Sequence, residues 1–368
     1  MSFIQAVKGG VFAGVAMTER FVNSRSSASF RDVRNFLLLQ YPAALGTALH
    51  ATPLIPALRH AVPGCSIVVA GSGFGLDVFR SNPGIDKIIE TANPLYALKK
   101  AVSQLRRENP FAGSPYVTLT STGNERTKIA LQAMLSGAAV RVGFTVVPQL
   151  YRVPLAYDPG LSQIANNLRI IEALGHASRH FEPEIFFSEE DLKDARAFLA
   201  RSGVRPNQPV VVFVTQTSVA QRKGWRPERF RAVARFLVER YDAHVLFIGT
   251  SKEAPMIDKL RRELEFSTTS IAGKTSLSQL AAFMRLCKVG LTLDTGPMHI
   301  GRSVGLPMVI IAPAWSPPVE WLPICDPRFR ILKNADIPFA PTDYIIDEVS
   351  VKEVTEALSA LMENPAKG

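Results

Sequence analysis

Four residues with side chains or backbone suited to chemistry lie close together near the end of one apolar run, in the segment LTLDTGPMHIGRSVGLPMVIIAP (291–313): Asp294, Thr295, Gly296 and His299. The apolar residues 291–293 predict a buried strand that delivers the acid into a turn. Pro297 is suited to the first position of a helix, because its missing N–H would have no helical partner there. The free backbone N–H groups of a first helical turn attract anions. The segment therefore predicts an anion-binding turn.

The residues that follow complete a strand, turn, helix and strand unit. Gly305 and Pro307 predict a turn into a second apolar strand, residues 308–311. Such units place ligands at the carboxyl ends of parallel strands. An ordinary βαβ crossover without a ligand is the alternative, and periodicity alone does not separate the two. The acid, hydroxyl and imidazole at the strand end favour a site.

The run DTGPMHIGRSVGLPMV resembles the donor-site motif of the family 9 glycosyltransferases, the bacterial heptosyltransferases of lipopolysaccharide assembly. The resemblance implies an α/β protein of the GT-B fold, with two Rossmann-like domains facing a cleft. It also implies inversion at the anomeric carbon without a metal, and no cofactor beyond a nucleotide-diphosphate sugar as co-substrate. Asp294 would bind sugar hydroxyls, and the turn from Gly296 to His299 would face the diphosphate. A buried histidine satisfied by backbone is the alternative for His299.

Two further segments resemble donor-side elements of that family. KGWRPERF resembles its Lys-x-Trp-Pro-x-x-x-Phe element, which assigns a phosphate-binding lysine to Lys223, with Arg226 as an insertion. The loop between an apolar strand predicted over residues 210–214 and a helix predicted to begin at Pro227 supplies the hydroxyls of Thr217 and Ser218. FIGTSKE resembles a Gly-x-x-x-Glu loop whose glutamate binds ribose hydroxyls, and Glu253 is the matching position. The alternatives are a solvated loop cation at the lysine and a helix-start acid, favoured by the helix dipole, at the glutamate.

The acceptor-side element departs from the family pattern. YPAALGTALHATPLIPALRHAVPG resembles the Gly-Asp-x-x-x-x-Thr-Pro element, in which the acid is the proposed general base, but here Thr47 follows Gly46. A threonine hydroxyl has a pKa far above that of a carboxylate and cannot take a proton unaided at neutral pH. In a helix predicted over residues 47–60, His50 lies on the same face as Thr47 and titrates nearest to neutral pH. We therefore take His50 as the candidate base or acceptor-orienting residue.

Length, composition and charge bound the class of protein. The 368 residues suit two domains, and 47% hydrophobic with 20% charged residues is typical of a globular protein. Apolar runs are too short to span a membrane. Three scattered cysteines fit a reducing cytoplasm. The net charge of +10 favours an anionic partner: a nucleotide diphosphate, a phosphorylated glycolipid or an anionic membrane. Nucleic acid is disfavoured, since no nucleic-acid-binding motif is present.

Strand and helix patterns alternate from residue 35 onward, which predicts parallel sheets wound by helices. Residues 1–34 form a basic extension that is either a lipid-bound amphipathic segment or a tail with a weak helix. The remaining predicted divisions are an acceptor-side Rossmann-like domain (35–180), a linker (181–205), a donor-binding Rossmann-like domain (206–345) and a C-terminal helix with its tail (346–368).

These features predict a glycosyltransferase that moves a sugar, such as heptose, from a nucleotide-sugar donor to a lipopolysaccharide-core or other glycolipid acceptor. Its predicted location is the cytoplasm, in peripheral contact with the inner leaflet of the inner membrane. A nucleotide-sugar epimerase could share the two-domain plan. A nucleotide-sugar-binding protein without transfer is the non-enzymatic alternative, which Thr47 supports. A Rossmann oxidoreductase is disfavoured because GSGFG (71–75) lacks the full glycine fingerprint.

Overall fold

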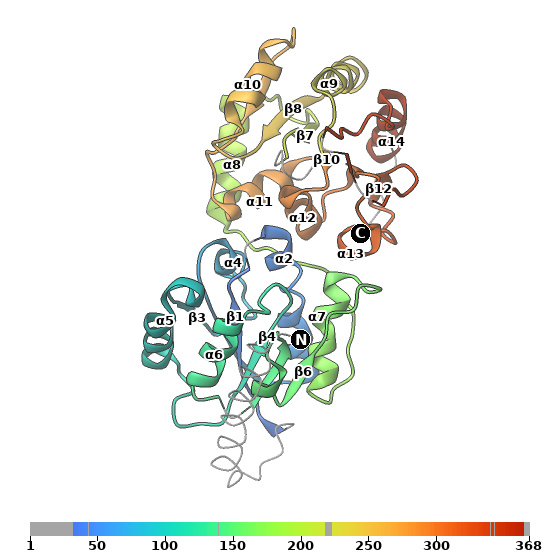
Figure 1. Cartoon of the computed structure of the whole chain (residues 1–368). Helices are drawn as coiled ribbons and strands as arrows, with labels where there is room; N and C mark the ends of the chain where they lie inside the picture. Colours follow the sequence, from blue (N-terminus) through green and yellow to red (C-terminus); the bar gives the residue numbers. More distant parts are fainter. Residues whose placement is uncertain are drawn as a thin grey trace. The chain divides into compact units, whose positions relative to one another are not determined.

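The chain divides into two compact units, Met1–Glu184 and Ile185–Gly368. The computed structural model describes residues 32–42, 44–138, 140–217, 223–338, 340–341 and 343–363. Most of the predicted basic extension, residues 1–31, lies outside the described residues. Each unit contains a six-stranded sheet with helices packed on its faces (Figure 1). In the part of the chain that the structure describes, no helix combines the length and apolar character needed to cross a membrane.

The sheet of the first unit is entirely parallel. Its strands run in the order β3-β2-β1-β4-β5-β6, and they are β1 (Asn35–Gln40), β2 (Ser66–Gly71), β3 (Lys87–Glu90), β4 (Val117–Thr120), β5 (Val140–Phe144) and β6 (Val153–Leu155). The interior residues of β1 and β2 are apolar on both faces of the sheet because helices cover both faces. The short strand β6 was not predicted from the sequence.

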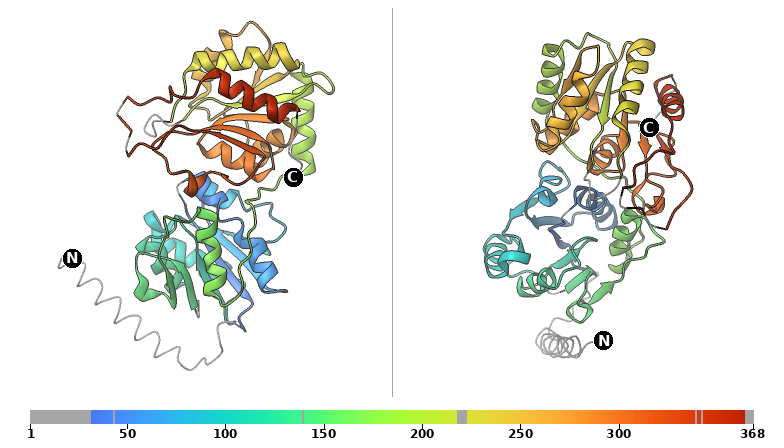
Figure 2. Two further views of the ribbon diagram at one scale, coloured as in Figure 1. Left: turned by 90° about the vertical axis from the view of Figure 1, so that its right-hand side faces the viewer. Right: turned by 45° about the horizontal axis from the view of Figure 1, so that its top comes forward.

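Helices on the two faces of this sheet bury its side chains. They are α2 (Leu45–Leu49), α3 (Leu54–Ala61), α4 (Phe74–Asp77), α5 (Pro94–Glu108), α6 (Thr127–Leu135) and α7 (Gln163–Ala173). Leu37 and Leu39 of β1 share a core with Leu105 of α5 and Ile129 of α6. Helices α3 and α7 pack together on the opposite face (Figure 2).

The single helix predicted over residues 47–60 is wrong, because the chain forms α2 and α3 with a break between them. Pro53 lacks the N–H that would continue the helix, and a proline disfavours helical geometry in the residue before it. The Thr52 hydroxyl donates instead to the Leu49 carbonyl at 2.7 Å. His50 is the C-cap of α2. Thr47 and His50 therefore share a short helix end, and the helix does not continue past them.

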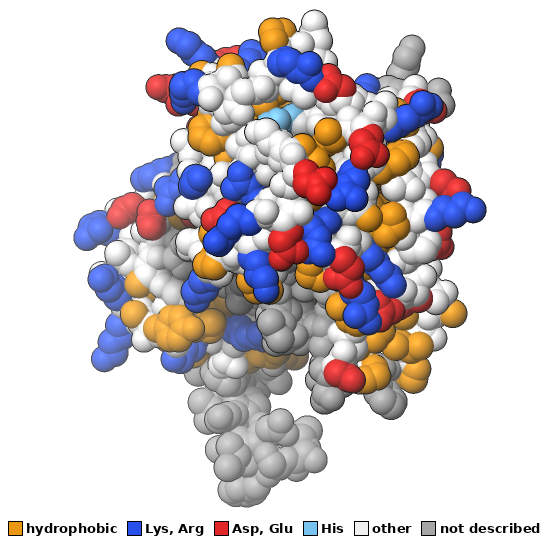
Figure 3. Space-filling view, turned by 90° about the horizontal axis from the view of Figure 1, so that it is seen from above, with side chains coloured by type: hydrophobic (Ala, Val, Ile, Leu, Met, Phe, Trp, Pro, Cys, Tyr) orange, Lys and Arg blue, Asp and Glu red, His pale blue; other side chains and the backbone are white. Residues whose placement is uncertain are grey.

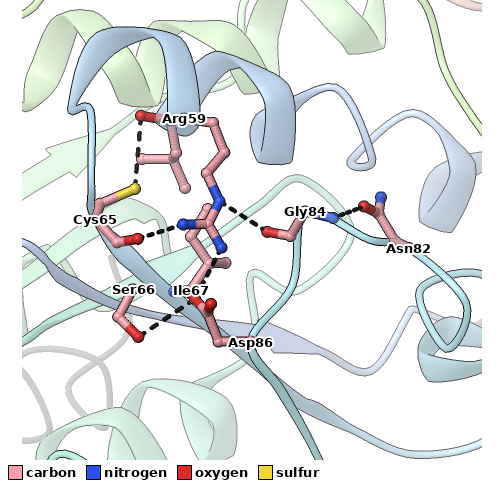
Figure 4. Close-up of polar contacts among 8 residues, drawn as sticks. Arg59, Cys65, Ser66, Ile67, Asn82, Gly84 and Asp86 are labelled. Carbon is pink, nitrogen blue, oxygen red and sulfur yellow. Dashed lines mark hydrogen bonds and ion pairs between the residues drawn. The ribbon is translucent and has the colours of Figure 1, made fainter.

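A half-buried arginine braces the amino ends of the strands in this unit (Figure 4). Arg59 of α3 donates through Nε to the Gly84 carbonyl at 3.0 Å, through Nη1 to the Cys65 carbonyl, and through Nη2 to Asp86 Oδ2 at 2.8 Å. The same Asp86 oxygen accepts the backbone N–H of Ile67 at 2.6 Å. These contacts join α3 to the start of β2 and to the turn before β3, at the sheet edge opposite the carboxyl ends.

The sheet of the second unit repeats the parallel plan. Its order is β12-β11-β10-β7-β8-β9, formed by β7 (Val210–Val214), β8 (His244–Ile248), β9 (Thr268–Ser270), β10 (Val289–Leu293), β11 (Met308–Ile311) and β12 (Phe329–Leu332). Counted within the unit from β9, this is third, second, first, fourth, fifth and sixth strand. The first unit has the same order. The predicted α/β class with two parallel sheets is confirmed.

The helices of the second unit are α8 (Glu189–Arg201), α9 (Pro227–Tyr241), α10 (Ala254–Arg262), α11 (Leu277–Leu286), α12 (Gly296–Ser303), α13 (Pro318–Trp321) and α14 (Val351–Glu363). Phe230 of α9 and Leu358 of α14 share a core with Phe213 of β7. Phe198 of α8 packs edge-on against Phe283 of α11, with ring centroids 5.5 Å apart. Helix α8, which falls in the stretch predicted as a linker, therefore packs within the second unit.

The strand order reverses once in each sheet, between β1 and β4 and between β7 and β10. At such a switch point the two adjacent loops leave the carboxyl ends of the strands in opposite directions, which opens a crevice for ligands. The fold thus singles out the residues that follow β1 and β4 in one unit, and β7 and β10 in the other.

Candidate functional site

A buried ion pair lies at the switch point of the second unit. Asp294 directly follows β10, and Lys223 lies in the loop between β7 and α9. Lys223 Nζ lies 2.7 Å from Asp294 Oδ2, and the two side chains are only 13% and 3% exposed. Little water screens a pair at this depth, so each charge is strongly felt by whatever binds beside it. The structure brings together two residues that the sequence placed 71 positions apart.

Two residues beyond β11 complete the surroundings of this pair. The ring centroid of Trp315 lies 5.4 Å from Lys223 Nζ, within the range of a cation–π contact. The Ser316 hydroxyl donates to Asp294 Oδ2 at 3.5 Å. The sequence reasoning missed both residues. Their position in the sequence could have predicted them, because they follow β11, the strand next to β10, at the same edge of the sheet.

The helix after Asp294 begins at Gly296, one residue before the predicted start at Pro297. Thr295 is its N-cap, but the Thr295 hydroxyl donates back to the Leu293 carbonyl at 3.4 Å and makes no capping hydrogen bond. Pro297 has no N–H, and the Met298 N–H donates to the Thr295 carbonyl at 3.0 Å, so in this turn the positive end of the helix dipole and the Gly296 N–H face a further partner. This geometry suits an anion, as the sequence predicted.

His299 is buried in this helix and carries no charge at neutral pH. Its side chain is 4% exposed, and burial lowers the pKa of the imidazole to about 4, against an opposing effect of the Asp294 carboxylate. The positive charges of Arg302 and Lys223 lower the pKa further. The ring packs edge-on near Trp321, with centroids 5.9 Å apart. His299 can therefore offer a ligand one N–H donor or one acceptor nitrogen, but no positive charge.

Glu253 lies in the loop after β8, the strand next to β7. Its Oε2 accepts the backbone N–H of Thr250 at 2.7 Å, which holds the carboxylate over the loop. Gly273 presses against that loop: a Cβ there would lie 2.6 Å from Ser251 Cα, and its φ of +69° also demands glycine. Its N–H donates to the Gly249 carbonyl at 2.9 Å. The predicted ribose-binding loop is thus held in one shape.

Aromatic and ionic contacts anchor the loop that carries Lys223. Trp225 is buried, and its Nε1 donates to the Val349 carbonyl at 2.9 Å. Arg226, the insertion relative to the family pattern, pairs with Asp347. Helix α9 begins at Pro227, as the sequence predicted. Of the two predicted hydroxyl residues, Thr217 is half-buried after β7, whereas Ser218 lies outside the described residues.

Neutral side chains join the strands at the switch point of the first unit. Gln40, the last residue of β1, donates through Nε2 to the Ser121 hydroxyl at 2.8 Å. The Tyr41 backbone N–H donates to Asn124 Oδ1 at 2.7 Å. Both contacts are buried, so amide and hydroxyl groups replace the ion pair found in the second unit.

Thr47 and His50 lie at this same edge. Thr47 is 9% exposed and packs on Gly123. A Cβ at position 123 would lie 2.3 Å from Thr47 Cγ2, and the φ of +80° there also favours glycine. His50 is 1% exposed, and its carbonyl accepts Asn167 Nδ2 at 2.8 Å. Asn167 Oδ1 in turn accepts the Thr122 backbone N–H at 2.9 Å. The loops after β1 and β4 are thereby tied to α7.

Comparison with known proteins identifies the family represented by these features. The model of glycosyltransferase family 9 (heptosyltransferase) matches residues 134–329, more than half of the chain. The lipopolysaccharide core heptosyltransferase OpsX of Haemophilus influenzae is 30% identical over 34% of this chain and 35% of its own length. Lipopolysaccharide heptosyltransferase 3 of Escherichia coli is 23% identical over 72% of this chain and 78% of its own length. The chain thus spans about a third of the first of these relatives and most of the second.

Solved structures share the whole architecture. A glycosyl transferase of family 9 from Veillonella parvula matches 92% of this chain and 99% of its own, with a TM-score of 0.81 and 21% identity. The ADP-heptose lipopolysaccharide heptosyltransferase II of E. coli matches 90% of this chain and all of its own, with a TM-score of 0.72 and 19% identity. These likenesses show that the chain has the GT-B fold.

Proposed function

Because the chain belongs to glycosyltransferase family 9, we propose that it transfers a sugar from a nucleotide-diphosphate donor to a glycolipid acceptor of the lipopolysaccharide-core type. The names of the relatives suggest heptose as the sugar and ADP as the nucleotide. The observation that carries the proposal is the buried Lys223–Asp294 pair beside the first turn of α12. A cation and the N-terminus of a helix without a side-chain cap, at one strand end, match the charge of a diphosphate.

The donor half of the proposal assigns each group a partner by its chemistry. Lys223 and the positive N-terminus of α12, from Gly296 to His299, bind the diphosphate. Asp294 accepts hydrogen bonds from sugar hydroxyls, with Thr217 and Ser218 as further polar contacts. Glu253 accepts from the ribose hydroxyls, and Thr295 shapes the turn. A neutral His299 adds one N–H donor.

The reaction we propose is a single displacement that inverts the anomeric carbon. An acceptor hydroxyl oxygen bonds to that carbon as the bond from the carbon to the phosphate oxygen breaks, and the electron pair leaves with the nucleoside diphosphate. Lys223 and the α12 N-terminus stabilise the negative charge that develops on the leaving group, so that no metal is needed for it. A base takes the proton of the attacking hydroxyl.

We assign the acceptor side to Thr47 and His50. The Thr47 hydroxyl contacts the attacking group, and the more deeply buried His50 either takes the proton or fixes the end of α2. The variant His50→Gln separates these roles. Loss of a proton acceptor removes the acid limb of the pH profile of kcat, whereas loss of a positioning residue changes KM and leaves the shape of the profile unchanged.

The decisive experiment incubates the protein with ADP-heptose and a lipopolysaccharide core that lacks the terminal heptose, and measures the mass of the acceptor. We expect a gain of one heptose that depends on Lys223. Thermal unfolding in the presence of nucleotide diphosphates should show a raised midpoint, because a ligand bound only by the native state stabilises it. Absence of both effects across nucleotide sugars would overturn the proposal.

A second candidate function is nucleotide-sugar binding without transfer. Thr47 favours it, because this position offers no carboxylate to take the proton. A raised unfolding midpoint with ADP-heptose, combined with no sugar transfer to any glycolipid acceptor, would select this function. The donor residues would then have the same roles.

A further inference from the structure

Positive charge is unevenly shared between the two units. Residues 1–184 contain 18 Lys and Arg against 11 Asp and Glu, a net charge of +7, whereas residues 185–368 contain 24 against 21, a net charge of +3. The first unit therefore carries most of the net charge of +10. Donor phosphates do not account for this excess, since the proposed donor site lies in the second unit.

Helix α5 concentrates that charge on one face. Its buried side contains Ala101, Val102 and Leu105. From Lys99 onward, exposed side chains recur at helical spacing along the opposite side: Lys99, Lys100, Ser103, Arg106 and Arg107. Tyr96 is also exposed and precedes a kink in the helix at Ala97. Tyr96 is 87% exposed, which is unusual for a large aromatic side chain. The helix therefore presents an aromatic ring followed by four cations.

Contacts with the neighbouring helix fix this face in place. Lys128 of α6 donates through Nζ to the Leu95 carbonyl at 2.5 Å, and Arg106 donates through Nε to the Leu135 carbonyl at 2.6 Å. Lys87 of β3 donates to the Glu108 carbonyl at 2.7 Å. Figure 1 shows α5 at the outer edge of the first unit, beside α6. These hydrogen bonds thus hold Lys87, Arg106 and Lys128 in place on the surface of the first unit.

Acidic partners are scarce on this surface. Glu108 is the one acid within α5, and it pairs with Arg107 at 3.1 Å. Among the residues that the structure describes, Lys99 and Lys100 form no ion pair. Lys99 and Lys100, exposed and without counter-charges, would attract an anionic surface.

Helix α9 of the second unit shows the contrast. It also has 15 residues and a proline at its start. Its Arg231 pairs with Glu263, and its Arg235 lies 3.8 Å from Glu265. Basic and acidic side chains are interspersed on the surface seen in Figure 3. Helix α9 therefore does not have a face of unpaired cations like that of α5.

We propose that this basic α5 face, defined as Lys87, Lys99, Lys100, Arg106, Arg107 and Lys128, docks on an anionic lipid bilayer. Each cation near an anionic leaflet contributes to binding, and tyrosine favours the headgroup region, where Tyr96 would lie. The inference rests on the proposed function to the extent that a lipid-anchored acceptor requires the protein at the membrane. Binding of the face to lipid can nevertheless be measured without any transfer.

The test measures sedimentation of the full chain with phosphatidylcholine vesicles that contain or lack phosphatidylglycerol. We expect binding only to the anionic vesicles, weakened by salt because of screening. The double variant Lys99→Gln/Lys100→Gln should bind about 25-fold more weakly, about fivefold for each charge removed. The matched control Arg235→Gln/Arg240→Gln removes two exposed cations from α9 and should change binding less than about twofold. Tyr96→Ser should also weaken binding.

Several outcomes would overturn the docking face: no binding of the wild-type chain to anionic vesicles, unchanged binding of the α5 variant, or an equal loss in the α9 control. Transfer to a core oligosaccharide without acyl chains tests the proposed function separately from membrane docking. We expect the α5 variant to retain it, since no membrane is involved. A wild-type chain that binds vesicles but transfers nothing would contradict the proposed function and leave the docking face supported. If the α5 variant loses transfer to that oligosaccharide while its binding to vesicles stays intact, the docking face is contradicted.

Discussion

The two switch points share a strand order but differ in the side chains that close them. Between β7 and β10 a lysine and an aspartate meet at 2.7 Å, next to the uncapped first turn of a helix. Between β1 and β4 the buried contacts are made by Gln40, Ser121 and Asn124, all neutral. The same backbone plan therefore gives one strand end with strong local charge and one with a network of amides and hydroxyls.

Under the proposed function, this difference would let one topology serve two kinds of ligand. Buried charges suit a diphosphate, whose own charges replace the water that the pair has lost. Neutral donors and acceptors suit the hydroxyls of a sugar, because hydrogen bonds of defined geometry then decide what binds. The comparison predicts that changes at β7/β10 act on the charge of the leaving group, and changes at β1/β4 on the acceptor.

The largest expected effect comes from breaking the charged end with Lys223→Ala. Loss of the cation should lower kcat for transfer by about 10³-fold, since charge on the departing diphosphate loses its main stabilising group. The free energy of unfolding should fall by about 3 kcal/mol, because Asp294 would remain buried without its partner. Steady-state kinetics and urea unfolding measure the two effects.

The matched control for this variant is Lys288→Ala. Lys288 is exposed and precedes β10, the strand that Asp294 follows, so it lies at the opposite end of the same strand. It should leave both quantities nearly unchanged. Equal kinetic losses in the two variants would show that net charge, and not the pair at the switch point, supports transfer.

The pH dependence of the free energy of unfolding tests the state of His299 beside the charged switch point. Its pKa is about 4 in the folded chain and about 6.5 when unfolded, so the unfolded state binds the proton more readily. The stabilising effect of keeping His299 neutral is fully present above pH ~6.5 and is lost as pH falls towards ~4, by up to about 3 kcal/mol. His299→Gln should flatten this part of the stability curve, as measured by urea unfolding across that pH range.

His180→Gln is the control, because His180 is exposed in the first unit and pairs with Glu182 on the surface. It should leave the curve unchanged. His244, buried in β8, also has a pKa lowered by burial and by the charge of Arg261, so some slope should persist in the His299 variant. An unaltered slope in His299→Gln would contradict the neutral, buried state assigned to this histidine.

The role of the neutral switch point can be tested by adding the carboxylate that the family pattern has there. Thr47→Asp supplies a carboxylate at the end of α2, against Gly123, in a side chain of similar size. If Thr47 contacts the attacking hydroxyl, kcat should rise by about 10²-fold, the contribution of a positioned general base. Thr127→Asp places the same charge at the exposed start of α6 and should change kcat little. No gain over this control would remove Thr47 from the acceptor site.

Much of the donor site was predictable because local pattern decides it. The strand 210–214, the helix at Pro227 and the turn at Asp294 follow from apolar runs, a proline and a strand end, and each lies where expected. The Lys223–Asp294 distance and the contribution of Trp315 required the tertiary order of β7, β10 and β11. No spacing in the sequence encodes that order. The break between α2 and α3 was missed because helical periodicity was given more weight than Pro53.

The smallest expected effect comes from the amino ends of the first sheet, where Arg59 and Asp86 brace β2 and β3 at the opposite strand ends from the switch point of that sheet (Figure 4). Arg59→Met should lower the free energy of unfolding by about 2 kcal/mol, since two carbonyls and a carboxylate lose their donor. Arg80→Met breaks a more exposed pair with Asp77 and should cost about 0.5 kcal/mol. Neither variant should alter kcat or the affinity for ADP-heptose. A tenfold change in kcat in Arg59→Met, at a temperature where the chain remains folded, would show that the amino ends take part in function. The assignment of stability to the amino ends and of binding to the carboxyl ends of these strands would then be wrong.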